Sequence, residues 1–431
     1  MAVIKLPYHT RQIEINIEDK YLRGVLRPRP HAAGLSQTQL INEALDSPIE
    51  SPPLEALVCG KRGMVIITSD HTRPLPSGIT LPIILKRARA ANPAIDITIA
   101  VASGSHRKMT PDEIQGKFGP DIARNEKIII HDARQREDMV TLGELNTGLR
   151  VEVNRAIIET DLLMAEGFIE PHFFAGFSGG RKSLFPGMAS LECIMANHCA
   201  RYIGDPNART GILERNPVHE EALAMAKLAG LSFILNVVLD GDKRVIKAFA
   251  GHYDRAHLAG CEFVRSLSEV PALSADIVIT TNGGYPLDQN IYQSIKGLTA
   301  AEACCDDGGV IIMLSSCCDG HGGESFYRMM REAPDPETLA RQITGRGRQD
   351  TKPDQWQAQI LARVLMSRRV IMVTDMCERK LFTDMHMAWA GCIDEALVMA
   401  RAWKGPEASI TVIPDGVGVI VTEVGRKGES K

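Results

Sequence analysis

The amino-acid sequence predicts an α/β fold: two Rossmann-like domains with mostly parallel sheets and a ligand cleft between them. Short apolar runs such as Met64–Ile67 and Ile277–Thr280 have the length and continuity of strands buried on both faces. Helical patterns separate these runs, which implies right-handed crossovers and parallel pairing. Polar clusters follow several of the strands, where open α/β sheets bind ligands.

The first unit begins near residue 51. Residues 1–50 are expected to form an irregular arm with one or two edge strands, because Pro28-Arg29-Pro30 argues against a long regular element. Thr110-Pro111-Asp112-Glu113 is a capping box that starts a helix. The elements expected in this unit are strands at 64–68, 97–102, 128–130 and 162–165, helices at 78–91, 188–202 and 218–228, and a hairpin of 233–239 with 245–250.

A second strand–helix series starts at about residue 275. Its expected elements are strands at 276–280, 309–314, 370–373, 410–413 and 417–422, and helices at 290–303, 353–366 and 393–403. We place the domain boundary near residue 270, with an N-terminal domain of 1–270 and a C-terminal domain of 271–409. Residues 410–431 are expected to rejoin the first domain, because chain ends often lie close together.

Composition excludes several classes of protein. The net charge of -4, without a basic block, argues against nucleic-acid or anionic-membrane partners. No stretch approaches the ~20 apolar residues of a membrane helix, and no export signal is evident, so we expect a cytoplasmic protein. The ten cysteines include no C-x-x-C spacing and are interpreted as reduced, mostly buried side chains.

Three polar clusters should converge on one crevice because each follows a strand. They contain Asp70, His106 and His172. Either histidine is a candidate general acid or base, although a single histidine is more often a hydrogen-bonded structural residue. Arg73 suits a bidentate carboxylate or phosphate clamp, and an Asp70–Arg73 turn salt bridge is the plain alternative.

Lys182 follows a glycine-rich loop that departs from the phosphate-binding pattern, since Gly176 is not followed by a second glycine just before the lysine. A loop lysine also suits covalent attachment of a cofactor, and a solvated lysine is the alternative. His198 has no second histidine three or four positions away, so a metal bound there needs ligands from elsewhere, for instance from a cofactor. Gln293 and Lys296 share one helix face and suit ligand closure, or simply an amphipathic helix.

These motifs, taken together, closely resemble the nickel-pincer-nucleotide-dependent lactate racemase family. The resemblance runs from about residue 50 to the C-terminus, and five motifs occur in the family's order. The motifs are Thr68-Ser-Asp-His-Thr-Arg-Pro74, Ala102-Ser-Gly-Ser-His106, Glu170-Pro-His172 with Gly179-Gly-Arg-Lys182, Ala196-Asn-His198, and Tyr292-Gln293 with Lys296.

The resemblance implies a role for each candidate residue. The cofactor is a pyridinium-derived nickel pincer nucleotide attached to Lys182, and His198 is a nickel ligand. His106 and His172 form the acid/base pair, and Asp70 and Thr72 hold the cofactor or position Arg73. The implied substrate-binding residues are Arg73, Tyr292, Gln293, Lys296 and Trp356.

The implied reaction inverts C2 of a 2-hydroxycarboxylate, lactate or a larger acid, by hydride transfer through a 2-keto acid. Hydride removal suits this carbon because a carbanion beside a carboxylate is costly, whereas loss of the hydroxyl proton together with hydride gives a planar ketone. Implied partners are the 2-hydroxy acid and cofactor-biosynthesis proteins, and the sequence leaves open whether the chain forms a homo-oligomer. The alternatives are a catalytically inactive carboxylate- or nucleotide-binding homologue and a phosphate-handling enzyme using residues 176–183. Residues 1–50 and 314–353 match no pattern.

Overall fold

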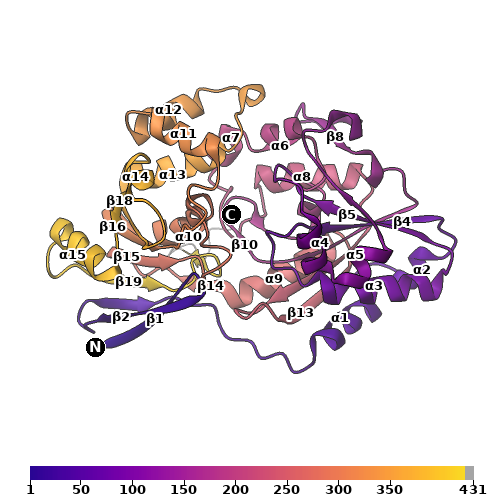
Figure 1. The fold of residues 1–431 in the computed structure, drawn as a ribbon, viewed down its shortest axis with the longest axis horizontal. Coiled ribbons are helices and arrows are strands. Elements are labelled where there is room, and N and C mark those ends of the chain that lie inside the picture. Colours follow the sequence, from indigo (N-terminus) through magenta and orange to yellow (C-terminus); the bar gives the residue numbers. More distant parts are fainter. Residues whose placement is uncertain (423–431) are drawn as a thin grey trace, which may run out of the picture.

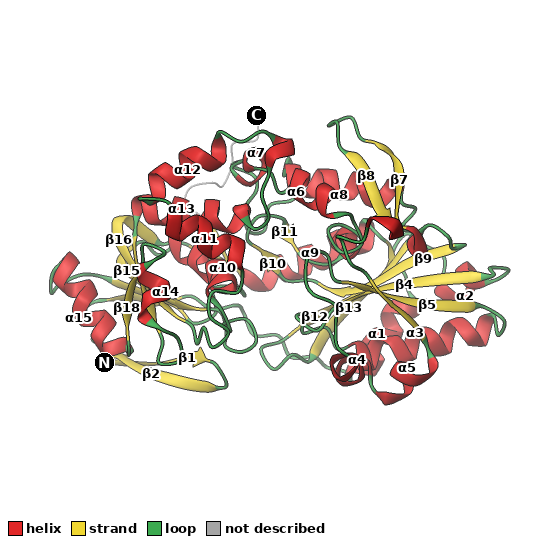
Figure 2. Ribbon diagram, turned by 45° about the horizontal axis from the view of Figure 1, so that its top comes forward, coloured by secondary structure: helices red, strands yellow, loops and turns green. Residues whose placement is uncertain are grey.

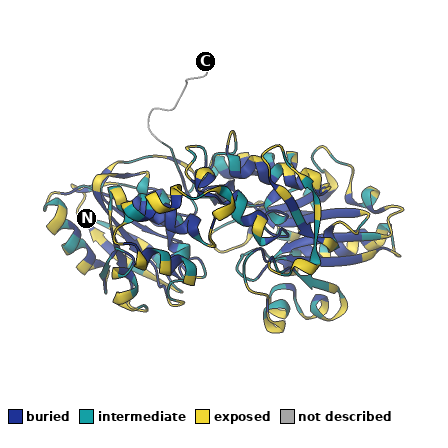
Figure 3. Ribbon diagram, turned by 90° about the horizontal axis from the view of Figure 1, so that it is seen from above, coloured by how far each residue is buried: buried dark blue, intermediate teal, exposed yellow. Residues whose placement is uncertain are grey.

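The computed structural model describes residues 1–422, which form two α/β lobes side by side (Figure 1). Each lobe is built on a six-stranded sheet with helices on its faces, and most neighbouring strands are parallel. The predicted fold class is therefore confirmed. In Figure 3 the strands of both lobes are largely buried, as expected for sheets covered by helices on both sides.

The first sheet has the strand order β13-β12-β9-β4-β5-β6. Only β13 is antiparallel, because a tight turn joins it directly to β12. The strands are β4 (Gly63–Ser69), β5 (Asp96–Ala102), β6 (Lys127–Ile130), β9 (Leu162–Phe168), β12 (Phe233–Leu239) and β13 (Val245–His252). The helices of this lobe are α1 (Gln37–Asp46), α2 (Leu54–Val58), α3 (Ser77–Ala91), α4 (Pro111–Phe118), α5 (Pro120–Asn125), α8 (Pro217–Leu228) and α9 (Arg255–Ser268).

The second sheet has the order β18-β17-β16-β15-β19-β3, and all its strands are parallel. The strands are β3 (Leu22–Val25), β15 (Ala275–Thr281), β16 (Cys305–Leu314), β17 (Arg369–Val373), β18 (Ala388–Ala390) and β19 (Ile410–Ile413). The helices are α10 (Ile291–Glu302), α11 (Glu324–Glu332), α12 (Pro336–Thr344), α13 (Gln355–Ser367), α14 (Arg379–Thr383) and α15 (Ile393–Lys404).

The first three strands of the chain belong to the second lobe. β1 (Ala2–Tyr8) and β2 (Arg11–Ile17) form a hairpin whose buried side chains share a core with that sheet, and β3 pairs with β19. Residues 1–50 were expected in the first domain, but β1, β2 and β3 join the second lobe, whereas α1 packs in the core of the first. Residues 410–431 were expected to return to the first domain; β19 lies in the second sheet, whereas Ile420 packs with Phe177 and Val264 of the first lobe. Strands at a sheet edge carry too little periodicity to show their partner. β20 (Ile420–Thr422) pairs with β14 (Glu269–Pro271), and residues 423–431 lie outside the described chain. The boundary near residue 270 stays a prediction.

Several elements differ from expectation. The helix predicted over 188–202 is two short helices, α6 (Leu191–Asn197) and α7 (Ala200–Ile203), separated at His198, which caps the end of α6. The hairpin of β7 (Met139–Glu144) and β8 (Arg150–Asn154) and the helices α11 and α12 were not predicted. No helix among residues 1–422 is long and apolar enough to cross a membrane.

The lobes are joined by packing as well as by the chain. The largest hydrophobic core is continuous between them, since it includes Ile194 of α6 and Trp356 and Leu361 of α13. Gln359 of α13 also donates a hydrogen bond to the carbonyl of Ala200 in α7. Figure 2 shows α6 and α7 of the first lobe beside α12 and α13 of the second. The interface therefore fixes the position of the loops described next.

Candidate active site

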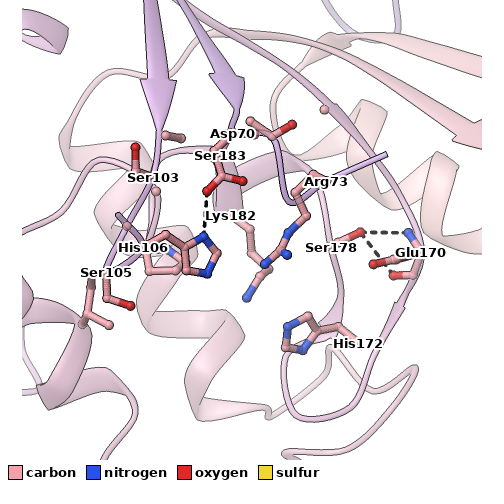
Figure 4. A pocket seen from close by; sticks show the side chains of 18 of the residues that line it. Asp70, Arg73, Ser103, Ser105, His106, Glu170, His172, Ser178, Lys182 and Ser183 are labelled. Carbon is pink, nitrogen blue, oxygen red and sulfur yellow. Dashed lines mark hydrogen bonds and ion pairs between the residues drawn. The ribbon is translucent and has the colours of Figure 1, made fainter. Parts of the chain in front are cut away.

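Between the lobes lies a cavity of ≈ 180 Å³ that is lined by residues of both. All of the candidate residues except Thr72 line it: Asp70, Arg73, His106, His172, Lys182, His198, Tyr292, Gln293, Lys296 and Trp356. Figure 4 shows Arg73, His106, His172 and Lys182 from the first lobe pointing toward a common space. The expected convergence of strand-end clusters is therefore found, while the role of each residue stays a prediction.

Asp70 and His106 come together because β4 and β5 are parallel and in register, with Ser69 opposite Ala102 at their carboxyl ends. His106 Nδ1 lies 2.7 Å from Asp70 Oδ2. A carboxylate accepts only, so the imidazole carries hydrogen on Nδ1 and leaves Nε2 free to accept a proton. This geometry suits a general base.

Asp70 stays ionised although it is buried. Burial would raise its pKa, but the hydrogen bond and charge of His106 and the charge of Arg73 hold the pKa well below its usual range. The backbone N–H and the hydroxyl of Thr72 both donate to Asp70 Oδ1, at 3.1 and 2.6 Å. Arg73 Nη1 in turn donates to the Thr72 hydroxyl at 3.2 Å. Thr72 therefore supports Asp70 and Arg73 from outside the cavity wall.

His172 is held differently. It lies on β10 (Pro171–His172), which turns back into β11 (Gly176–Phe177). Its Nδ1 accepts a hydrogen bond from the backbone N–H of Ala175 at 3.2 Å, so the neutral ring carries its hydrogen on Nε2. Burial and the charges of Lys182 and Lys296 lower the pKa of His172 well below its ordinary value. This imidazole is neutral at physiological pH.

The Gly179-Gly180 turn brings Lys182 to the cavity. Both glycines have positive φ, and the Gly180 N–H donates to the Asn236 side chain at 2.7 Å. A Cβ on Gly180 would lie 2.6 Å from the His257 ring, and one on Gly179 would lie 2.7 Å from Asn236 Oδ1. The turn therefore requires glycine for both conformation and space.

Arg181 and Lys182 point to different environments. Arg181 is 1% exposed and donates a 2.7 Å hydrogen bond to the carbonyl of Ala175, which fixes the loop beneath the site. Lys182 faces the cavity, and its Nζ lies 5.6 Å from the centre of the Phe174 ring. Burial and the charges of Arg181 and Arg73 lower the pKa of Lys182 well below its usual value. Burial therefore favours the uncharged form of this amine, the form in which a lysine is nucleophilic.

His198 presents a neutral imidazole whose Nδ1 has no protein partner in the described chain. Its Nδ1 is buried and makes no hydrogen bond among residues 1–422, and its ring packs against Phe174 and Trp356 at 5.1 and 5.0 Å. Burial, followed by the charge of Lys182, lowers its pKa to about 3. No group of three or more His, Cys, Asp or Glu side chains in the described chain is arranged to hold a metal. A metal at His198 therefore needs ligands from a non-protein group.

The second lobe supplies the opposite wall through the first turn of α10. Asn290 caps this helix by accepting from the Gln293 N–H at 2.9 Å. The Trp356 indole N–H donates to the Tyr292 hydroxyl at 2.9 Å, which joins α13 to α10. Gln293 Oε1 is buried without a hydrogen-bond partner among residues 1–422, and burial lowers the pKa of Lys296 to about 8. Both side chains are thus available to a ligand.

Residues 315–323 form a glycine-rich segment within the stretch 314–353, which matched no sequence pattern. This segment wraps around the start of α10. The N–H groups of Ile291 and Tyr292 donate to the carbonyls of Gly320 and His321. A Cβ on Gly322 would lie 2.4 Å from the Asn290 side chain, so this close approach requires glycine. Residues 315–323 therefore position Tyr292, Gln293 and Lys296, a role that only the folded chain reveals.

The cavity fits an anionic, metal-bearing cofactor together with a small carboxylate. Three basic side chains, Arg73, Lys182 and Lys296, face it, and one of its two acids, Asp70, is engaged by His106. A nucleotide-hydrolase loop is disfavoured, because Gly180–Ser183 forms a short 3-10 helix and not the start of a long α-helix. Sequence reasoning missed the supporting roles of Arg181, Asn236 and Phe174, whose residue types carry no specific signal.

Comparison with known proteins identifies the family. Residues 8–211 match the lactate racemase N-terminal domain, and residues 270–421 match the lactate racemase C-terminal domain. The chain is 51% identical over 425 residues to a lactate racemase of Thermoanaerobacterium thermosaccharolyticum, covering 98% of this chain and 100% of that protein. It is 49% identical over 423 residues to a lactate racemase of Lactiplantibacillus plantarum, with coverage of 98% and 100%.

Comparison with solved structures points to the same family. The lactate racemase apoprotein from Thermoanaerobacterium thermosaccharolyticum superimposes with a TM-score of 0.95 at 51% identity, covering 98% of this chain and 100% of that one. A Thermotoga maritima protein with 19% identity and a TM-score of 0.65, covering 91% of this chain and 100% of that one, shares the fold. Fold, cavity and relatives together define an isomerase of the racemase class. The chain belongs to the lactate racemase family, which confirms the resemblance of its motifs.

Proposed function

We propose that this protein inverts C2 of a 2-hydroxycarboxylate, with lactate as the first candidate, using a nickel pincer nucleotide attached to Lys182. The observation that supports this proposal is the meeting in one cavity of an amine with a lowered pKa, a neutral imidazole whose Nδ1 has no partner among residues 1–422, and two further histidines. The names of the relatives favour lactate.

Lys182 and His198 are the residues that would hold the cofactor. The depressed pKa of Lys182 leaves its amine free to form an amide-type bond, and neutral His198 can donate a ring nitrogen to nickel. When bound, the cofactor supplies a hydride acceptor for the hydrogen on C2. Loading requires dedicated cofactor-biosynthesis proteins, which are the proposed maturation partners.

Arg73 and Lys296 bind the substrate carboxylate from opposite lobes, and Gln293 offers an amide to its polar atoms. His106 then removes the hydroxyl proton through Nε2, because Nδ1–H is directed to Asp70. Asp70 stabilises the imidazolium that forms. Loss of the hydroxyl proton to His106, together with loss of the C2 hydrogen and its electron pair to the hydride acceptor that the bound cofactor would supply, would leave a planar 2-keto acid that can take hydride back on either face.

His172 serves the opposite enantiomer. It lies on the loop after β9, apart from His106 after β5, so the two imidazoles approach the substrate from different strands. Its Nε2–H donates to a substrate oxygen in the neutral state. To accept a proton there, it must first exchange its bond with the Ala175 N–H. The two histidines therefore share one chemistry but begin from different tautomers.

The test uses protein produced with the cofactor-biosynthesis enzymes. We expect nickel in the holoenzyme, a mass adduct on the peptide containing Lys182, and racemisation of one member of a panel of enantiopure 2-hydroxy acids followed by chiral chromatography. The variants His106→Ala and His172→Ala should keep the adduct and lose racemisation.

An adduct with no turnover of any 2-hydroxy acid would overturn the activity. Absence of both adduct and nickel after co-production would favour an inactive carboxylate- or nucleotide-binding homologue. Full racemisation by both histidine variants would refute the assigned acid/base pair.

A further inference from the structure

Lys117 lies behind the cavity, on the last turn of α4, and is not among its lining residues. Its Nζ donates hydrogen bonds to the carbonyl of Arg73 at 3.1 Å and to that of Leu75 at 3.4 Å. Both carbonyls belong to the loop between β4 and α3. This loop carries Arg73 into the cavity.

The composition of the loop explains why it needs an external donor. Pro74 and Pro76 follow Arg73 and Leu75 directly, and proline has no N–H. The segment can therefore form few backbone hydrogen bonds of its own; Arg73 N–H reaches the Asp70 carbonyl at 3.3 Å and Ser77 N–H reaches that of Leu75 at 2.9 Å. Lys117 supplies donors to the two carbonyls that precede the prolines.

Lys117 is half-buried, and its ammonium group forms no ion pair among residues 1–422; its hydrogen-bond partners are the two carbonyls. Burial lowers its pKa to about 8, against the opposing charges of Glu166 on β9 and Asp70, while Arg73 acts in the same sense as burial. Glu166 is itself fully buried and accepts from Thr68 and Thr80. A buried ammonium group is costly unless its donors are used, so the two carbonyl contacts are strongly favoured.

We propose that Lys117 is a positioning residue for substrate binding, which holds the Arg73 backbone so that the guanidinium meets the substrate carboxylate. This inference rests on the proposed function only for the identity of the carboxylate. Lys117 touches neither cofactor nor substrate, and acts through the 70–76 loop.

The first test measures the loop itself and requires no catalysis. Hydrogen–deuterium exchange of the holoenzyme is compared among wild type, Lys117→Met, Lys117→Arg and the control Lys86→Met, which removes an exposed lysine of α3 without touching the loop. We expect faster exchange in peptides covering residues 70–77 of Lys117→Met only. Lys117→Gln, which keeps one donor, replaces Lys117→Met if the latter does not fold.

The second test measures substrate binding. Loss of the charge-assisted bonds in Lys117→Met should raise KM for the racemised 2-hydroxy acid by roughly tenfold, with kcat within about threefold of wild type, because uniform binding is lost. Lys117→Arg should restore much of the loss, and Lys86→Met should match wild type.

The results of these two tests distinguish failure of the role proposed for Lys117 from failure of the proposed racemase function. Unchanged exchange over residues 70–77 in Lys117→Met, or an unchanged KM, would overturn the role of Lys117. A fall in kcat alone, or in thermal stability alone, would also overturn it. A wild-type holoenzyme that racemises no 2-hydroxy acid would overturn the proposed function, and hydrogen exchange would still decide whether Lys117 holds the loop.

Discussion

His106 and His172, the two proposed acid/base residues, look equivalent in the sequence, but their hydrogen bonds make them different. His106 has a carboxylate on Nδ1, whereas His172 has a backbone N–H on the same atom. A carboxylate partner fixes the base-competent tautomer and stabilises the imidazolium, and an N–H partner does neither. The environment of each ring, and not its residue type, sets how it handles a proton.

Asp70→Asn tests this dependence. The amide can present its N–H₂ to His106 Nδ1, so Nε2 becomes protonated and loses its capacity as a base. We expect kcat to fall by about 10²-fold or more, with cofactor attachment retained, by comparison with the loss seen when a triad carboxylate is amidated. Steady-state racemisation with mass analysis of the Lys182 peptide measures both.

Thr72→Val is the matched control, because it removes one hydrogen bond to the same carboxylate and leaves the contact with His106. Its kcat should fall by less than about tenfold, the range of a single supporting hydrogen bond. Equal losses in the two variants would contradict tautomer control by Asp70.

The lowered pKa of Lys296 leads us to expect that substrate binding depends on pH. Its pKa is lowered to about 8 by burial and by Arg73, so the ammonium is charged below that pH and neutral above it. The attraction to a carboxylate is therefore present at neutral pH and lost as the pH rises through about 8. We expect KM to rise between pH 7 and 9.5.

Lys296→Arg should remove most of that rise, because a guanidinium stays charged over the whole range. Part of the rise in KM should remain in the variant, because the pKa of Lys117 is also lowered to about 8 and its charge is lost over the same pH range. Identical pH profiles of KM in the variant and the wild type would exclude Lys296 as the titrating group.

At the scale of elements, the turn before the 3-10 helix at Gly180–Ser183 depends on a tertiary contact that hydrophobic periodicity cannot predict. The sequence predicts a glycine-rich loop ending in Lys182, but it cannot show that His257, from α9, fills the space beside Gly180. That contact lies 77 residues away in the chain and forms only after the lobe folds.

Gly180→Ala tests this turn. A Cβ there would lie 2.6 Å from the His257 ring at a φ of +54°, so the turn must shift and move Lys182. We expect a loss of more than about 2 kcal/mol of stability, the sum of the conformational cost and overpacking, and a reduced cofactor adduct. Thermal unfolding and peptide mass analysis measure the two effects.

Gly230→Ala separates conformation from contact. Gly230 has a φ of +76° with no atom within 4 Å of its Cβ position, so only the conformational cost of about 1 kcal/mol applies. If both variants lose the same stability and keep the same adduct, the His257 contact does not matter.

The sequence predicted the elements of the lobe cores well, because continuous apolar strands and caps are local signals. The Thr110 capping box is confirmed, and helix α3 spans Ser77–Ala91 as expected to within a residue. The break between α6 and α7 at His198 was missed, since the pattern of apolar residues continues across it. One or two edge strands were expected within residues 1–50, but their place beside the second sheet was not, because patterns this short do not show the partner strand.

At the scale of the whole molecule, Arg348 of the second lobe makes three polar contacts with the first lobe. It donates to the carbonyls of Ala196 and Thr147 at 3.0 and 2.9 Å, and to the buried carboxylate of Glu221 at 2.5 Å. Ala196 lies two residues before His198. The side chain from the second lobe therefore supports the helix that presents the proposed metal ligand.

Arg348→Ala should destabilise the protein by about 3 kcal/mol, because Glu221 is left buried without its cation. Thermal unfolding measures the loss, and nickel content should fall with it. The control Arg341→Ala removes an exposed arginine whose ion pair with Glu337 is solvated, with an expected effect under about 0.5 kcal/mol. Equal stability of the two variants would contradict the bridging role.

The sequence predicted which residues line the cavity and that the strand-end clusters meet there, but not how the two lobes dock. His106 and Lys182 follow recognisable loops, and the family motifs pointed to Trp356. Their meeting with α10 depends on how two lobes dock through α7 and α13, and no local pattern encodes that docking. Contacts between segments that are far apart in the chain determine how the lobes dock.

The pairing of β3 with β19 also governs when the second lobe can be completed during synthesis. Leu22–Val25 leaves the ribosome early, yet its partner Ile410–Ile413 is among the last strands to emerge. β3 stays without its partner strand while nearly four hundred further residues are synthesised. Folding of this lobe is thus a late event, and a ribosome that stalls before residue 410 would release a chain with an open sheet edge.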